Sequence, residues 1–238
     1  MTFERSFIRS AVCELRFPIL LEMESSPPPS QLGKRLRREY PLYERKDSVS
    51  LKPGSAPVET ENIHCFMTKT REWTVAFKAY ALSLETKNYE GFTKFLERLM
   101  YVVEGSRTLI DADFFTRVGL RYVNALPARR DLSGWVRKSL VESLADGTYG
   151  DVELFQQQVR GIARRGKYTF RHGIGEFKGP PEDGHEYTLD FDFYAENVPF
   201  DSLQELLNDL HSECFAFFCW AIGEEARTVL GRSTPKNI

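Results

Sequence analysis

The sequence has few cysteines, little excess of charge and no long apolar run. Its four cysteines, Cys13, Cys65, Cys214 and Cys219, include no Cys-x-x-Cys pair of the kind that marks a structural zinc site. Each lies in an apolar strand or helix pattern, which favours reduced core thiols in a reducing compartment. The net charge of -2 excludes a chain dominated by nonspecific attraction to nucleic acid or anionic membranes. No apolar run approaches the ~18–20 residues of a membrane span, so no membrane insertion is expected.

The common catalytic and cofactor motifs are also missing. There is no GxSxG, HExxH, P-loop or GxGxxG pattern, and the glycine cluster at 173–175 lacks the strand–turn–helix context of a phosphate loop. The first twelve residues contain no apolar segment like that of a secretory signal, which predicts a cytoplasmic protein. We therefore expect no cofactor and no metal, and a binding role is favoured over an enzymatic one.

What the sequence does contain is one strand pattern that occurs twice. The stretch 12–18 alternates apolar and polar residues through Leu15-Arg16-Phe17, and 117–126 does the same through Leu120-Arg121-Tyr122. A helix, several strands and a longer helix follow each copy. We therefore predict an α+β fold built by internal duplication of a β-α-β(3-4)-α unit, with halves at 1–110 and 111–238 packed as one globular unit. A curved antiparallel sheet with its helices on one face satisfies this order.

Periodicity and capping residues place the individual elements. The expected strands cover 12–17, 48–51, 63–68, 73–77, 82–86, 115–126, 151–165, 167–177 and 187–195. Four helices are expected. The first runs from a cap at Ser30 to Tyr40, and the second covers 89–104 and ends at Gly105. The third runs from a cap at Ser133 to Leu144, and the fourth from a cap at Ser202 to about Leu230. Loops are expected over 25–30, 53–57 and 179–184, which are rich in Pro, Gly and Ser.

The same stretches resemble a sporadically distributed bacterial and archaeal protein family with no established activity. The resemblance rests on 12–17, 117–124, the aspartates within 189–193 and the long closing helix, and it covers nearly the whole chain. The chain departs from the family at its start, where it lacks a proline-rich run. The patchy occurrence of the family implies an accessory role, such as a bacterial defence or toxin–antitoxin locus. The element order also resembles the duplicated TATA-box-binding-protein fold, which by itself implies no function.

The polar sides of the strands form the first candidate site. Its residues are Glu14, Arg16, Arg121, Asp190 and Asp192. Asp190 and Asp192 alternate along one strand and so share a face, as ligands of a divalent cation would, and Glu14 or Glu153 could be a third ligand. Cross-strand ion pairs are the alternative, because a nearby guanidinium competes with a cation for the carboxylates.

A basic hairpin forms the second candidate site. Its residues are Arg160, Arg164, Arg165, Lys167 and Arg171. Such a cluster can contact phosphate groups, or it can pair with the acidic stretch over 182–196.

The four histidines give weaker signals. His211 and Cys214 have the i, i+3 spacing of a zinc-binding pair, but a core cysteine is favoured. His64 and Cys65 are adjacent and should point to opposite sides of a strand, whereas His172 and His185 are expected at the surface.

Together these patterns favour a non-enzymatic accessory protein that binds a protein partner through the polar face of its sheet. Nucleic-acid binding through the sheet or the basic hairpin is the first alternative. A metal-dependent hydrolase centred on Asp190 and Asp192 is the second.

Overall fold

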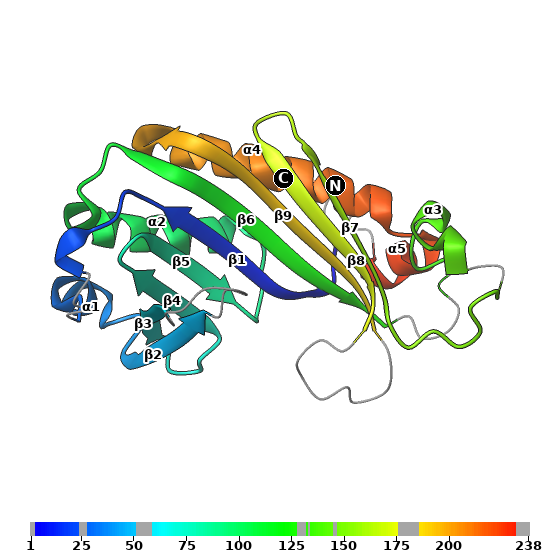
Figure 1. The fold of residues 1–238 in the computed structure, drawn as a ribbon, viewed down its shortest axis with the longest axis horizontal. Coiled ribbons are helices and arrows are strands. Elements are labelled where there is room, and N and C mark those ends of the chain that lie inside the picture. The colour runs from blue at the N-terminus through cyan, green and yellow to red at the C-terminus, as the bar shows by residue number, and fades with distance from the viewer. Residues whose placement is uncertain are drawn as a thin grey trace, which may run out of the picture. The chain divides into compact units, whose positions relative to one another are not determined.

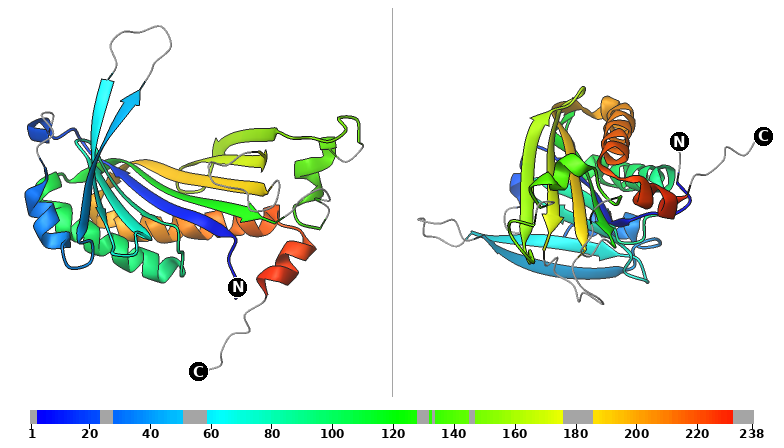
Figure 2. Two further views of the ribbon diagram at one scale, coloured as in Figure 1. Left: turned by 90° about the horizontal axis from the view of Figure 1, so that it is seen from below. Right: turned by 90° about the vertical axis from the view of Figure 1, so that its right-hand side faces the viewer.

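The structure is a computed structural model, and it describes residues 3–23, 28–50, 59–127, 132, 134–144, 147–175 and 186–231. In this part of the chain, nine strands form one open antiparallel sheet in the order β2-β3-β4-β5-β1-β6-β9-β8-β7. The helices pack on one side of the sheet (Figures 1 and 2). This arrangement confirms the predicted α+β class, the antiparallel sheet and the one-sided helix layer. We call the side without helices the outer face.

The helices and strands have the following bounds. The strands are β1 (Ile8–Arg16), β2 (Leu42–Ser50), β3 (Glu59–Met67), β4 (Trp73–Lys78), β5 (Ala81–Thr86), β6 (Phe114–Leu126), β7 (Phe155–Ile162), β8 (Lys167–Ile174) and β9 (Tyr187–Pro199). The helices are α1 (Ser30–Leu36), α2 (Phe92–Ile110), α3 (Lys138–Val141), α4 (Leu203–Ala221) and α5 (Glu224–Leu230). Short 3-10 turns cover η1 (Leu21–Met23), η2 (Glu142–Leu144) and η3 (Phe200–Ser202).

By the density of its contacts the chain divides into two compact units. Unit 1 comprises Met1–Arg9, Arg121–Phe193 and Asp209–Ile238, and unit 2 comprises Ser10–Leu120 and Tyr194–Asn208. The units differ from the halves 1–110 and 111–238, because part of β9 and the start of α4 belong with the first half's residues. The half-repeat boundaries therefore stay a prediction.

The strands are ordered in the same way on both sides of the neighbouring pair β1 and β6. On each side, the other strands of that half follow outward in reverse chain order. β1 neighbours β5, the last strand of the first half, and β4, β3 and β2 follow outward. β6 neighbours β9, the last strand of the second half, and β8 and β7 follow outward. A duplicated unit would produce this order, but the order alone does not establish the duplication, which stays a prediction.

The apolar positions of the strands pack as their alternation predicts. In unit 2, Cys13 and Leu15 are fully buried and lie opposite Leu84 and Leu82 of β5. In unit 1, Phe191 is fully buried and stacks on Phe170 of β8, with ring centroids 4.8 Å apart. Because period-2 alternation sends every second side chain to the helix side, these residues form the core and their neighbours reach the outer face.

Helix α2 is longer than predicted. Gly105 lies inside it rather than ending it, and Ser106 and Ile110 beyond the glycine are both buried. A glycine costs a helix only about 1 kcal/mol, and burial of the following turn offsets that cost. The helix ends instead at Asp111, which adopts a left-handed conformation and donates its backbone N–H to the Arg107 carbonyl. In α1, Ser30 is the first helical residue rather than a side-chain cap.

Two predicted helices of the second half are wrong in extent, for one shared reason. The helix predicted over 133–144 is only α3 and η2, and the helix predicted to reach Leu230 breaks into α4 and α5. The segment before α3 pairs with the segment between α4 and α5. Val136 forms an isolated antiparallel bridge with Ile222, and the Gly223 N–H donates to the Trp135 carbonyl at 2.8 Å. Backbone groups engaged across these two segments cannot also form helical bonds. The predicted cap Ser133 and the predicted loops at 53–57 and 179–184 lie outside the described residues.

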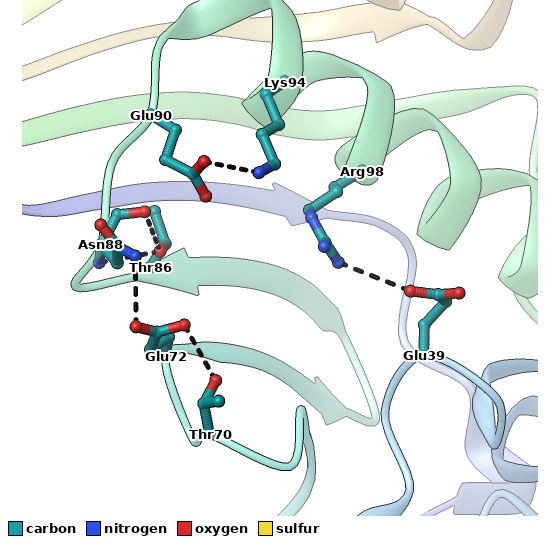
Figure 3. Close-up of polar contacts among 8 residues, drawn as sticks. All are labelled: Glu39, Thr70, Glu72, Thr86, Asn88, Glu90, Lys94 and Arg98. Atoms are coloured by element: carbon teal, nitrogen blue, oxygen red, sulfur yellow. Dashed lines mark hydrogen bonds and ion pairs between the residues drawn. The ribbon is translucent and has the colours of Figure 1, made fainter.

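The segment that leads from the strands into α2 is held by polar contacts (Figure 3). The Asn88 N–H donates to Thr86 Oγ1 at 3.1 Å, and the Asn88 amide donates to Glu72 Oε1 at 3.1 Å. On α2, Arg98 lies 3.9 Å from the Glu39 carboxylate, and its guanidinium stacks 4.8 Å from the centre of the Trp73 ring. These contacts fix the helix against the strands of unit 2.

The glycines at 223 and 105 give a first testable prediction. An added Cβ at Gly223 would lie 2.1 Å from the Gly134 carbonyl oxygen, whereas one at Gly105 would meet only Leu36 at 3.7 Å. Gly223→Ala should therefore lower the free energy of unfolding by about 2 kcal/mol, because backbone must move. Gly105→Ala, the matched control, should raise it by up to about 1 kcal/mol through helix propensity. Urea denaturation of both variants measures this, and equal effects would contradict the assigned helix break.

Candidate binding surface

Asp190 of β9 is the centre of a polar cluster on the outer face of unit 1. Its side chain is only 3% exposed, although it belongs to the polar set of its strand. Arg121 of β6 covers it with two parallel bonds, from Nε to Oδ1 at 2.7 Å and from Nη2 to Oδ2 at 2.8 Å. Arg171 of β8 adds a third contact, from Nη1 to Oδ2 at 3.3 Å. The buried carboxylate is therefore neutralised by two guanidinium groups, each about 44% exposed.

The cluster extends across four neighbouring strands. Arg171 also donates from Nε to Oε1 of Gln158 on β7 at 2.8 Å, and Gln158 lies directly opposite Arg171 in the strand register. The row therefore runs from Arg121 on β6 through β9 and β8 to the edge strand β7. We call these four residues, Arg121, Asp190, Arg171 and Gln158, the outer-face cluster. Its geometry is fixed because each guanidinium is held at two points.

A separate row lies on the outer face of unit 2. Arg16 donates from Nε to Glu14 Oε1 at 2.7 Å, and Arg117 of β6 approaches the same oxygen at 3.6 Å. The Arg117 guanidinium lies 4.4 Å from the centre of the Tyr194 ring on β9. It also passes over Gly119, where an added Cβ would lie 2.4 Å from Arg117 Nη1. Gly119 thus leaves the room that lets Arg117 lie flat on the sheet.

Four of the five residues predicted for the polar face fall into these two rows. Arg121 and Asp190 meet in unit 1, where Asp192 lies two residues further along β9, and Glu14 and Arg16 meet in unit 2. The ion pairing weighed against a metal site is therefore present at Asp190. Sequence reasoning placed Arg171 only in the basic hairpin and missed Arg117 and Gln158. Alternation along each strand indicates the side of the sheet on which these residues lie. Only the strand order shows which of them are neighbours.

The predicted basic hairpin divides between the two sides of the sheet. Arg164 and Arg165, at its turn, contact Asp209 of α4 at 3.1 and 3.3 Å, and Arg164 also lies 3.8 Å from Glu213. Arg171 and Gln158 mark the opposite side, where Arg160 and Lys167 share the parity of Gln158 and Arg171 along their strands. The hairpin is therefore two smaller groups rather than one basic patch. Part of the acidic stretch weighed as its partner, 182–185, lies outside the described residues.

The histidines are engaged with tyrosines. His211 Nδ1 lies 3.1 Å from the Tyr122 hydroxyl, and Cys214 is buried beside it in α4. His172, which was predicted at the surface, is 3% exposed, and its Nδ1 lies 2.6 Å from the Tyr187 hydroxyl. That prediction was wrong because His172 shares the core parity of Phe170, on which its ring stacks at 4.8 Å. His185 lies outside the described residues.

Burial changes the proton affinity of these groups. It lowers the pKa of His172 and of His211 to about 4, and it raises the pKa of the Tyr187 hydroxyl well above its ordinary value. His64 of β3 bonds through Nδ1 to the Tyr43 hydroxyl at 2.9 Å, and burial followed by the charge of Arg45 lowers its pKa. Three histidines are therefore held neutral at pH 7.

Metal ligands do not gather in the described part of the chain. No group of three or more His, Cys, Asp or Glu side chains there is placed to hold an ion. At Asp190, the oxygens that a cation would need already accept guanidinium N–H groups. A cation would have to displace two arginines from a buried carboxylate, at the cost of breaking three charge-assisted contacts.

None of the described helices is both long and apolar enough to cross a membrane. Comparison of the chain with protein-family models and with curated proteins found no match.

Proposed function

We propose that the protein is a non-enzymatic binding protein whose outer-face cluster docks a protein partner. The observation that supports this best is the burial of Asp190 beneath two half-exposed arginines. Arginine is enriched at protein interfaces, where its planar guanidinium forms several bonds at once. Here the ends of both arginines are already immobilised before any partner arrives, so that binding costs less side-chain entropy.

The charge around the cluster favours an acidic partner segment. On the outer face of unit 1, Arg160 and Lys167 accompany Arg121 and Arg171, whereas the acidic side chains of the same strands there are Asp190 and Asp192. A carboxylate-bearing segment would find a surplus of positive charge over a fixed row of donors. Such complementarity speeds association and selects the partner more than it raises affinity.

Charge reversal near the cluster tests this proposal without exposing the buried carboxylate. Arg160→Glu with Lys167→Glu changes the outer face, and Arg37→Glu with Arg38→Glu makes the same charge change on exposed positions after α1. Tagged wild type and each tagged variant would be used as bait, and the proteins that they retain would be compared. All samples would be treated with nuclease, so that retention through nucleic acid is removed. A partner kept by wild type and by the Arg37/Arg38 control, but lost from the Arg160/Lys167 variant, supports the proposal. Equal retention by all three proteins contradicts it.

Nucleic-acid binding is the second candidate, and the basic surplus on the outer face is the observation that favours it. Single- and double-stranded oligonucleotides would then bind with an affinity that falls steeply with salt, by a slope of about 0.7–0.9 per phosphate contact. The Arg160/Lys167 variant should bind more weakly and with a smaller slope. Absence of binding at low salt would remove this candidate. A place in a defence or toxin–antitoxin locus stays a prediction from the resemblance alone.

A further inference from the structure

Strand β7 is an edge strand that lacks the usual protection of sheet edges. It is the last strand in the sheet order, and of its eight residues only Phe155 and Gly161 are not exposed. It carries a single charge, Arg160, and has neither lysine nor proline. The strand at the other end of the order, β2, carries four successive charged residues over 44–47. Charged residues, lysine and proline are the devices that keep edges from pairing with another chain.

Two exposed apolar side chains lie at opposite ends of β7. Ile162 closes the strand and is 87% exposed, and Leu154 directly precedes the strand and is 66% exposed. Both belong to the even-numbered set that faces outward with Gln158. An added Cβ at Gly175 would meet both Leu154 and Gln156, which places these two side chains on the same side. Within the described part of the chain, β8 is the only strand that β7 pairs with.

We propose that the occupant of this edge is a second copy of the chain, paired antiparallel through β7 about a two-fold axis at Gln158. In this register Leu154 of each copy lies opposite Ile162 of the other, so these two exposed apolar side chains cover each other twice. Arg160 lies opposite Gln156, an uncharged hydrogen-bonding partner, and Gln158 lies opposite itself. Edge pairing also satisfies the outward N–H and C=O groups of both strands.

Neighbouring registers fit less well, and this argues for a self-complementary strand rather than a general sticky edge. An axis at Val159 would place Ile162 opposite Gln156, and an axis at Arg160 would set the two arginines directly against each other. Like charges directly opposite each other destabilise a strand pair, whereas apolar and amide pairs stabilise it. The two-fold axis also gives an isologous contact that closes at two copies. Because one strand pair is a small interface, we expect a dissociation constant on the order of micromolar.

Disulfide trapping tests the register directly. In a Cys219→Ser background, which removes the one cysteine that is not buried, Gln158→Cys should form a covalent dimer on mild oxidation. Gln156→Cys alone should stay monomeric, because its expected partner is position 160, whereas a mixture of Gln156→Cys and Arg160→Cys should give a heterodimer. A dimer from Gln156→Cys alone, or none from Gln158→Cys, overturns the proposed pairing.

The association itself is tested on the full chain by sedimentation from about 1 to 200 µM. Ile162→Lys and Leu154→Lys should each raise the dimer dissociation constant about tenfold or more, and both should leave the melting temperature of dilute protein unchanged because the side chains are exposed. Tyr149→Lys, also at a highly exposed position but outside β7, is the matched control and should leave the dimer dissociation constant unchanged. A wild type that stays monomeric throughout, or a dimer that all three variants leave intact, overturns the proposal. Leu154→Lys and Ile162→Lys leave Arg160 and Lys167 unchanged, so this result is separate from the partner-retention test of the proposed function.

Discussion

The protein is expected to lose stability steeply as the pH falls from about 6.5 to 4. His172 and His211 are buried against tyrosine hydroxyls, and their pKa values in the folded chain are lowered to about 4. An unfolded histidine titrates near pH 6.5, so the unfolded chain binds more protons throughout this window. Each histidine contributes its full stabilisation above pH 6.5 and loses it as protonation favours the unfolded chain. At pH 5 the loss is about 2 kcal/mol for each histidine relative to pH 7.5.

Urea denaturation at pH 7.5 and at pH 5 measures this loss. His172→Gln keeps a hydrogen-bonding group near Tyr187 but cannot titrate, so between pH 7.5 and pH 5 this variant should lose about 2 kcal/mol less than the wild type, although it is less stable at pH 7.5. His64 should add a contribution of the same sign, because its pKa is lowered as well. A wild type equally stable at both pH values would show that these histidines are not buried neutral groups.

Removing Arg121 is expected to destabilise unit 1 by about 2–3 kcal/mol. Arg121→Met retains the length of the apolar stem but leaves the buried Asp190 carboxylate, among the residues that the structure describes, with the single ion-pair contact from Arg171. A buried charge that loses a partner costs far more than a surface ion pair is worth. Arg16→Met is the matched control, because its partner Glu14 is 30% exposed, and it should cost less than about 1 kcal/mol.

A second substitution separates the lost ion pair from lost packing. Asp190→Leu in the Arg121→Met background removes the uncompensated carboxylate, so the double variant should regain part of the lost stability. Denaturant midpoints of the single and double variants, measured at pH 7.5, give the coupling between the two positions. If Arg121→Met and Arg16→Met lower the free energy of unfolding equally, Asp190 is more hydrated than its burial indicates. The rigid outer-face cluster would then no longer support the proposed binding surface.

Local sequence patterns predicted most of the strands. Alternation around Leu15, Leu120 and Phe191 gave both the strands and the faces that they bury, because a side-chain period of two is written directly in the order of residues. Errors arose where one residue was taken as a boundary signal. Gly105 continues a helix, and the stretch around Val136 and Ile222 pairs across the chain, since packing and long-range backbone bonds outweigh the small local propensities.

The candidate site shows a similar division. The pattern of β9 gave Asp190 and Asp192 as polar residues on one strand face, and ion pairing with arginine was one of two interpretations left open. Arg171 could not be assigned to this group, because nothing in the sequence says that β8 neighbours β9 while β6 flanks β9 on its other side. For the same reason the hairpin arginines looked like a single basic patch, although α4 holds two of them.

The sequence by itself determined the α+β class, the inward and outward sets of the strands around Leu15, Leu120 and Phe191, and the presence of acidic and basic residues among the outward ones. Only the tertiary structure decided which charges meet, which histidines are buried and which strand is left at the edge. The physical reason is that alternation and helical periodicity are local properties of the chain, whereas strand order depends on the free energy of packing residues far apart in sequence. The burial of Asp190 and the exposure of Ile162 are consequences of that order.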